Sequence, residues 1–230
     1  MKIGALIPAR KGSKGIPGKN FKNFCGVPLW RWTLEAAKES LVFDLIILSS
    51  DGGFTDIQQE EGIIYDNERP QAMATDKADL DSLLRFYAEK NPDVDVWCLL
   101  QPTSPLREAG DISGAYDMLS ETTKSGEPKY DSVVSVFNHP VIGWIANTIY
   151  HKGRKYHTAL YHTENRPNRQ DRKDWFLENG AVYFVTIEGL MARGSRVGLM
   201  PGLYVMPKER SYELDDETDW RICEMLMGGK

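Results

Sequence analysis

The chain has 230 residues, of which 41% are hydrophobic and 27% are charged, and its formal net charge is −5. These values are ordinary for a soluble globular protein, and the length predicts a single domain. No apolar stretch approaches the roughly 20 residues needed to span a bilayer, and the N-terminus lacks the features of a signal peptide. We therefore expect no membrane contact.

The net charge and the cysteines further limit the class of protein to which the chain can belong. The pI is about 5.5, whereas a nucleic-acid-binding domain usually has a high pI and a broad basic face, so we expect no nucleic-acid partner. The three cysteines are odd in number and contain no C-x-x-C pair. This usage is typical of reduced thiols in a cytoplasmic protein.

Short apolar runs alternate with amphipathic segments over the first 137 residues. Several of the runs are apolar nearly throughout, as in strands that are covered on both faces. The pattern predicts strands at 2–8, 44–49, 62–65, 94–100 and 132–137, and helices at 28–40, 53–61, 77–90 and 108–120. Pro28 fits the first turn of the first helix, and Thr75-Asp76 fits the N-cap of the third. Such alternation predicts an α/β fold with a mostly parallel sheet and helices on both faces.

Residues 138–178 interrupt this alternation and hold all four histidines. The segment is too long for a simple connection in a compact domain, so we expect it to carry a function or an interface. Regular structure resumes with a strand at 179–187, a short helix near 188–192, a strand at 203–207 and a helix at 216–227.

The loop at residues 9–20, ARKGSKGIPGKN, follows the first predicted strand and is strongly basic. Seven Lys or Arg and no acidic residue precede Glu35 in the chain. In an open parallel sheet this loop lies at the carboxyl edge, where ligands bind, and its glycines let backbone N–H groups approach an anion. The spacing matches neither the P-loop nor G-x-G-x-x-G. On composition alone, an exposed basic turn fits as well as a phosphate site.

Polar residues also follow other predicted strands, in LLQPTSPLR (99–107) and around Arg69. Near the C-terminus, SYELDDETDW (211–220) is acidic, and an extended backbone would place Glu213 and Asp215 on one face. Two carboxylates beside phosphates suit Mg²⁺. For Asp216, Glu217 and Asp219 we favour a different interpretation, an acidic helix N-terminus.

Six stretches taken together resemble the acylneuraminate cytidylyltransferase family: IPARKGSKGIPGKN, SSDGG, LLQPTSPLR, NRPNRQD, ENGAVYF and ELDDETDW. They occur in family order from residue 3 to about 220. The resemblance implies a Rossmann-like nucleotidyltransferase fold. It also implies an enzyme that joins CTP to a keto sugar acid, a nonulosonic acid of sialic or legionaminic type, and releases pyrophosphate.

The resemblance also implies roles for individual residues. The catalytic set is Arg10, Lys14, Lys19 and Asp215, and the nucleotide site adds Asn20, Arg69 and Ala78. The sugar acid would be bound by Gln101, Arg166, Arg169 and Asn179. Mg²⁺ would be held by Glu213 and Asp215. The family further implies that 138–178 is a dimerisation arm, so that a homodimer is expected in which sugar sites borrow residues across the interface.

Three positions depart from the family pattern: Asp79-Leu80 where a Ser/Thr pair is common, Glu213 where aspartate is usual, and Asn168 where some relatives have arginine. Two alternatives remain open. One is a CMP-3-deoxy-manno-octulosonate synthetase or another sugar nucleotidyltransferase, and the other is a non-catalytic sugar-nucleotide sensor.

Overall fold

The computed structural model describes residues 1–13, 15–55, 60–75, 78–140, 142–151, 154–171 and 175–228. The chain divides into two compact units. We call Met1–Val136 together with Glu178–Lys230 the core unit, and Phe137–Leu177 the insert unit. Each is described by itself.

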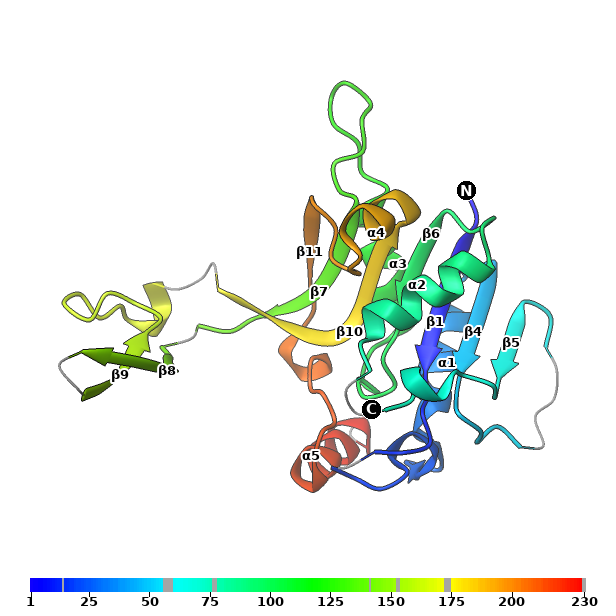
Figure 1. Ribbon diagram of the computed structural model, residues 1–230, viewed down its shortest axis with the longest axis horizontal. Coiled ribbons are helices and arrows are strands. Elements are labelled where there is room, and N and C mark those ends of the chain that lie inside the picture. The colour runs from blue at the N-terminus through cyan, green and yellow to red at the C-terminus, as the bar shows by residue number, and fades with distance from the viewer. Residues whose placement is uncertain are drawn as a thin grey trace. The chain divides into compact units, whose positions relative to one another are not determined.

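A seven-stranded sheet forms the centre of the core unit (Figure 1). Its strand order is β11-β7-β10-β6-β1-β4-β5. β1 pairs in parallel with β4 and β6, β4 with β5, and β7 with β11, whereas β10 runs antiparallel to β6. The predicted mostly parallel sheet is confirmed. The strands are β1 (Ile3–Pro8), β4 (Leu45–Ser49), β5 (Ile63–Asp66), β6 (Val96–Leu99), β7 (Ser132–Asn138), β10 (Phe176–Thr186) and β11 (Pro201–Val205).

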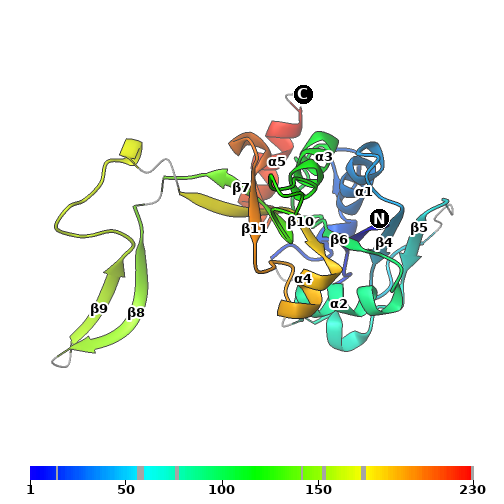
Figure 2. The ribbon, with the colours of Figure 1, turned by 90° about the horizontal axis from the view of Figure 1, so that it is seen from above.

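Helices cover both faces of this sheet, as predicted. Figure 2 shows α1 (Leu29–Glu39), α3 (Ala109–Leu119) and α5 (Glu217–Gly228) on one side, with α2 (Leu80–Lys90) and α4 (Ile187–Arg193) on the other. A short hairpin of β2 (Asn23–Phe24) and β3 (Val27–Pro28) precedes α1. The described part of the chain also has four 3₁₀ turns, η1 (Lys19–Phe21), η2 (Gln71–Met73), η3 (Arg169–Asp171) and η4 (Lys208–Arg210).

The apolar runs become strands because both faces of the sheet are buried. All six residues of β1 are buried. Alternate side chains point to opposite faces: Ala5 and Ile7 pack in the cluster that includes Trp30 of α1, while Leu6 is fully buried on the other face. This two-sided burial explains why the strands lack a polar alternation.

Three local predictions need correction. We predicted a helix over 53–61. The structure describes residues 53–55 and 60–61 of this segment, and no helix forms there. α2 begins at Leu80, and Asp79 is its N-cap rather than Thr75-Asp76; Asp76 itself lies outside the described residues. Pro28 occupies the N-cap of α1 with an extended backbone, φ −56° and ψ 141°, rather than the first turn.

The insert unit contains a hairpin of β8 (Trp144–His151) and β9 (Arg154–Ala159), which the sequence did not reveal. Its register shifts between Ile145 and Ile149, which breaks the strict alternation by which a strand is recognised. Trp144 is 58% exposed and its ring lies edge-on to Tyr161, with 5.9 Å between the centroids.

Two further findings concern the whole chain. In the part of the chain that the structure describes, no helix is long and apolar enough to cross a membrane. The three cysteines are free thiols, with Cys25 exposed and Cys98 and Cys223 buried.

Candidate active site

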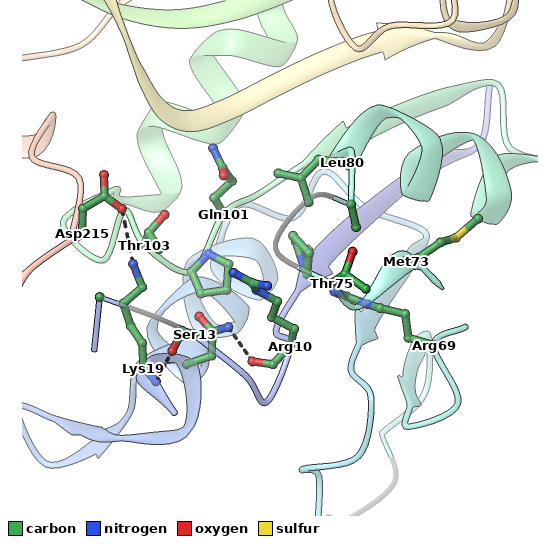
Figure 3. Close-up of a pocket in the computed structure, with 15 residues that line it drawn as sticks. Arg10, Ser13, Lys19, Arg69, Met73, Thr75, Leu80, Gln101, Thr103 and Asp215 are labelled. Atoms are coloured by element: carbon green, nitrogen blue, oxygen red, sulfur yellow. Dashed lines mark hydrogen bonds and ion pairs between the residues drawn. The ribbon is translucent and has the colours of Figure 1, made fainter. Parts of the chain in front are cut away.

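A cavity of about 350 Å³ opens at the carboxyl edge of the parallel strands, where β1 and β6 end (Figure 3). Segments from four parts of the chain line it: the basic loop after β1, the stretch leading into α2, the loop after β6, and the acidic segment before α5. Its lining residues are Pro8, Arg10, Ser13, Gly15, Lys19, Asn20, Arg69, Met73, Thr75, Ala78, Leu80, Gln101, Pro102, Thr103 and Asp215. Seven of the residues predicted for the site are therefore brought together here.

The basic loop is held in shape by its own side chains. The Ser13 hydroxyl donates to the carbonyl of Ile16 and accepts the Lys19 amide at 3.0 Å. Asn20 donates to the carbonyl of Arg10 at 2.9 Å. Gly15 lies against the carbonyl of Asp215, where a Cβ would clash. A glycine is required here because two backbone segments meet.

Lys19 joins the basic loop to the acidic segment. Lys19 is only 9% exposed. Its ammonium group donates to the carbonyl of Leu214 and lies 3.4 Å from a carboxylate oxygen of Asp215. The cation and the carboxylate therefore share one wall of the cavity.

Arg69 contributes a second, more rigid cation. Its Nε donates to the Ser49 hydroxyl at 2.9 Å and its Nη2 to the Ser49 carbonyl at 2.7 Å, at the end of β4. Burial lowers the pKa of the guanidinium, and the nearby positive charge of Arg10 also lowers it. Several cations lining one cavity, in a chain of net negative charge, form a site suited to an anion.

The acidic segment is anchored at three points. Leu214 is fully buried, and its amide donates to the carbonyl of Thr103 at 2.7 Å. Arg210 forms a bidentate pair with Asp111 of α3, at 2.9 and 2.7 Å. Asp216 accepts the amides of Thr218 and Asp219. The predicted acidic helix start is thus present at α5, and Glu213 and Asp215 precede it in the chain.

These two carboxylates differ in environment. Asp215 has a side chain 76% exposed and lines the cavity. Glu213 does not belong to its lining; it accepts a hydrogen bond from Thr103 at 3.3 Å. Burial raises the pKa of Glu213, and the charge of Asp215 raises it further.

The carboxylate pair fits a hard divalent cation. Burial and the neighbouring charge of Asp215 raise the pKa of Glu213, and a bound cation would offset that repulsion; Mg²⁺ commonly takes one or two carboxylates together with phosphate oxygens. Among the described residues, no group of three or more His, Cys, Asp or Glu side chains could hold a metal. A metal here would therefore depend on oxygen atoms of the substrate.

The two core-unit residues predicted to bind the sugar acid, Gln101 and Asn179, differ in their position relative to the cavity. Gln101 lines the cavity, and its amide donates to the carbonyl of Gly180 at 3.0 Å. Asn179 is 1% exposed and does not belong to the cavity lining. Its amide group accepts from Ser135 at 2.6 Å and donates to Ser211 at 2.9 Å. Asn179 therefore supports the site from behind, by tying β10 to β7 and to the acidic segment.

Besides Glu213 and Asn179, three predicted residues are not placed in the cavity. Lys14 lies outside the described residues. Arg166 is exposed in the insert unit, and Arg169 begins η3 of the same unit. Their predicted contact with the sugar acid remains a prediction.

The structure adds residues that the sequence analysis missed or left without a role. Ser13, Met73, Thr75 and Leu80 line the cavity. Arg107, 4% exposed, donates to the carbonyls of Gln101 at 3.2 Å and Ala181 at 2.9 Å, and to the Thr33 hydroxyl. The glycines around Ser13 could have indicated its role, because a serine in such a turn often hydrogen-bonds to the backbone of the same turn.

Comparisons with known proteins agree with this geometry. The sequence pattern of the cytidylyltransferase family matches residues 4–182. The chain is 35% identical over 225 residues to an N-acylneuraminate cytidylyltransferase of Oncorhynchus mykiss, covering 96% of this chain and 49% of the relative. It is 29% identical over 230 residues to an Escherichia coli protein of the same name, covering 96% and 51%. The chain thus spans about half the length of these curated relatives.

The fold has a solved counterpart in a CMP:2-keto-3-deoxy-manno-octonic acid synthetase complexed with CTP. The TM-score is 0.61 at 15% identity, and the match covers 100% of this chain and 99% of that one. At this identity the likeness concerns the fold alone.

An open, mostly parallel sheet with a cation-lined cavity at its carboxyl edge is the architecture of a nucleotide-binding α/β protein. The match over residues 4–182 makes the class specific: the chain belongs to the cytidylyltransferase family. The family resemblance drawn from the six sequence stretches is thereby confirmed.

Proposed function

We propose that this chain transfers CMP from CTP to the anomeric 2-hydroxyl of a nonulosonic acid of sialic or legionaminic type, with release of pyrophosphate. The observation that carries the proposal is the meeting of Arg10, Lys19, Arg69 and Asp215 at one cavity at the carboxyl edge of the sheet. The names of the relatives supply the substrate class. They favour a nonulosonic acid over an octulosonic acid, since the octonic acid synthetase shares only the fold.

The nucleotide would lie along the basic loop. Arg10 and Lys19 would neutralise the triphosphate, with Lys14 predicted to assist. Asn20 holds the loop through the Arg10 carbonyl, and Arg69 and Ala78 form the facing wall. Because the cations are built into the protein before substrate arrives, they need little rearrangement to stabilise charge that develops in the transition state.

The sugar acid would enter on the side of Gln101, where Asn179 fixes the adjoining backbone. The anomeric hydroxyl oxygen forms a bond to the α-phosphorus of CTP, the bond from that phosphorus to the bridging oxygen of pyrophosphate breaks, and the hydroxyl proton is released. Such a displacement requires positioning and charge neutralisation rather than a nucleophilic side chain. Arg166 and Arg169 are the predicted partners of the sugar carboxylate.

We further propose that Asp215, with Glu213, holds Mg²⁺ at the cavity. The two oxygen donors suit this ion, and the bound ion would supply neutralisation of phosphate charge. Asp215 would be the direct ligand because it lines the cavity, whereas Glu213 lies deeper, next to Thr103.

The proposal includes a homodimer formed through the insert unit, with sugar sites completed by the second subunit. The exposed Trp144 and the paired ring of Tyr161 support an interface in that unit. It also includes a cytoplasmic location, which is supported by the free cysteines and by the use of CTP.

The test is pyrophosphate release on mixing the protein with CTP, Mg²⁺ and a panel of keto sugar acids and sugar 1-phosphates. We expect release with nonulosonic acids and little with sugar 1-phosphates. Release only with a sugar 1-phosphate would assign the chain to another nucleotidyltransferase class. Tight CTP binding without turnover on any acceptor would indicate a sensor.

A further inference from the structure

A chain of polar side chains connects Arg69 in the nucleotide cavity to Asp66 on β5, the edge strand of the sheet. Arg69 donates from Nε to the Ser49 hydroxyl at 2.9 Å. That hydroxyl lies 2.8 Å from the hydroxyl of Tyr87 on α2, which in turn lies 2.5 Å from a carboxylate oxygen of Asp66. The other oxygen of Asp66 accepts the backbone amide of Glu68 at 2.7 Å. The cavity wall is therefore linked to β4, β5 and α2 through side chains.

The protons of this chain have one consistent direction. A guanidinium only donates hydrogen bonds, and an ionised carboxylate only accepts them, whereas each hydroxyl has a single proton to donate. Every contact receives a proton when Arg69 donates to Ser49, Ser49 donates to Tyr87 and Tyr87 donates to Asp66. The chain thus leads from a cation to an anion through two hydroxyl groups.

Burial makes this chain important for Arg69. Ser49 is fully buried, and Tyr87 and Arg69 are only 3% and 5% exposed. Burial raises the pKa of the Tyr87 hydroxyl, so the phenol keeps its proton. Burial lowers the pKa of Arg69, and the negative charge of Asp66 opposes that change. A buried cation is costly unless an opposite charge and hydrogen bonds compensate it.

The position of Asp66 leaves one edge of the guanidinium for a ligand. In the described part of the chain, the side-chain hydrogen bonds of Arg69 both go to Ser49, from Nε to its hydroxyl and from Nη2 to its carbonyl. Nη1 remains, and Arg69 lines the cavity (Figure 3). A carboxylate in direct contact would occupy these donors, because carboxylates pair readily with the guanidinium fork. A counter-charge two hydroxyls away balances the cation without occupying Nη1.

We propose that Tyr87 is a positioning residue for CTP: its hydroxyl, acting through Ser49, holds Arg69 so that Nη1 faces the nucleotide, and it connects the guanidinium to Asp66 as a remote counter-charge. The inference rests on the proposed function and deepens it, because Tyr87 lies outside the cavity lining. It extends the nucleotide site to the edge of the sheet.

The test measures the Kd for CTP by titration calorimetry in the presence of Mg²⁺ and without a sugar acid. Tyr87→Phe removes the hydroxyl and keeps the ring, which packs edge-on against Phe86 at 5.2 Å between centroids. We expect the Kd for CTP to rise by about three- to tenfold, the effect of losing one buried hydrogen bond. The matched control is Tyr65→Phe, which removes a hydroxyl of β5 whose partner is Glu60, and it should leave this Kd unchanged.

A double-mutant cycle tests whether Tyr87 acts through Ser49. Ser49→Ala interrupts the chain next to Arg69, so adding Tyr87→Phe to this variant should raise the Kd for CTP little further. Asp66→Asn keeps an acceptor oxygen but removes the charge, so it should weaken CTP binding less than Tyr87→Phe does. This variant tests the chain from its other end if Tyr87→Phe is unstable.

Thermal unfolding midpoints of all variants separate a loss of stability from a loss of CTP binding. A lower midpoint for Tyr87→Phe with an unchanged Kd for CTP would overturn the positioning role, as would an equal rise in Kd with and without Ser49→Ala. Either result leaves the proposed function standing. A wild-type protein that does not bind CTP would overturn the proposed function itself.

Discussion

The three cations that the structure places at the cavity are fixed to different degrees. Arg69 is tied to Ser49 by two hydrogen bonds, and Lys19 is held by the carbonyl of Leu214 and the carboxylate of Asp215. Arg10 lies between them at the end of β1, with its backbone carbonyl bound by Asn20. We propose that Arg69, which these hydrogen bonds hold, shapes the nucleotide site, and that Arg10, which lines the cavity from the basic loop, contacts the triphosphate.

Replacing Arg10 tests that assignment. Arg10→Ala should lower kcat/KM for CTP by a factor equivalent to about 2–4 kcal/mol of transition-state stabilisation, typical of losing a charged donor. The KM for the sugar acid should change little. Steady-state kinetics with each substrate varied in turn measures both, with Arg31→Ala on the exposed face of α1 as the control. Normal kcat/KM for CTP would make the loop an ordinary solvated turn.

Replacing the two carboxylates tests the metal assignment. Asp215→Asn preserves volume but removes a negative ligand, so we expect a large fall in kcat with partial recovery at high Mg²⁺ or Mn²⁺. Glu213→Gln should be milder, since Glu213 does not line the cavity. Initial rates over a Mg²⁺ titration provide the measurement.

Asp216→Asn is the matched control for this series, because asparagine caps α5 as well as aspartate does. Near-normal turnover of Asp215→Asn at low Mg²⁺ would remove Asp215 from the metal site.

At the level of single residues, much of the site could be predicted through the family resemblance. It implied site roles for Arg10, Lys19, Asn20, Arg69, Ala78, Gln101 and Asp215, and all of them line the cavity. The position of Asn179 could not be predicted, because its burial depends on Ser135 and Ser211, far from it in sequence. Leu80 and Met73 are apolar and gave no chemical signal.

At the level of elements, the start of α2 shapes one wall of the cavity. Asp79 stands where relatives often have a hydroxyl residue, and it caps the helix by accepting the amides of Asp81 and Ser82, both at 3.1 Å. Burial raises the pKa of Asp79, but the two backbone hydrogen bonds, the Ser82 hydroxyl and the charge of Arg196 together lower it below the ordinary value of 3.8. The departure from the family pattern is therefore a helix cap.

Because the pKa of Asp79 is lower in the folded state, the cap contributes stability above pH 3.8 and loses it as the pH falls through the folded pKa. Asp79→Ala should lower the free energy of unfolding by about 1 kcal/mol at pH 7. The difference from wild type should shrink below pH 3. Urea denaturation across this range measures it.

Asp79→Asn retains a capping oxygen without the charge. The free energy of unfolding of this variant should therefore lack the pH dependence that the Asp79 carboxylate confers. If the difference in the free energy of unfolding between wild type and Asp79→Ala stays constant down to pH 2, the assignment of Asp79 as a charged helix cap is wrong.

Element prediction succeeded where burial is two-sided and failed where it is not. β1, β4 and β6 are uniformly buried and were recognised from their apolar runs. The β8–β9 hairpin has mixed composition and an irregular register, so its pattern resembles a loop. At 53–55 and 60–61, the described parts of the helix predicted over 53–61, no helix forms. Phe54 packs on Trp30 and Tyr65 there, so its apolar side chain did not signal a helix.

At the level of the whole molecule, the insert unit is the proposed interface. We predict a dimeric mass by light scattering at micromolar concentration. Trp144→Ser should shift the population toward monomer and reduce activity, because a large exposed aromatic side chain is lost from that unit. Leu41→Ser, which changes a 91% exposed residue of the core unit, is the control. A fully active monomer would rule out shared sites.

We propose that CMP moves intact from CTP to a keto sugar acid, and ³¹P NMR of a reaction containing the protein, CTP, Mg²⁺ and a nonulosonic acid would show this transfer. We predict that the CTP signals are replaced by one phosphodiester signal and one equivalent of pyrophosphate. Unchanged CTP with every sugar acid, or a diphosphate-linked product formed from a sugar 1-phosphate, would contradict it.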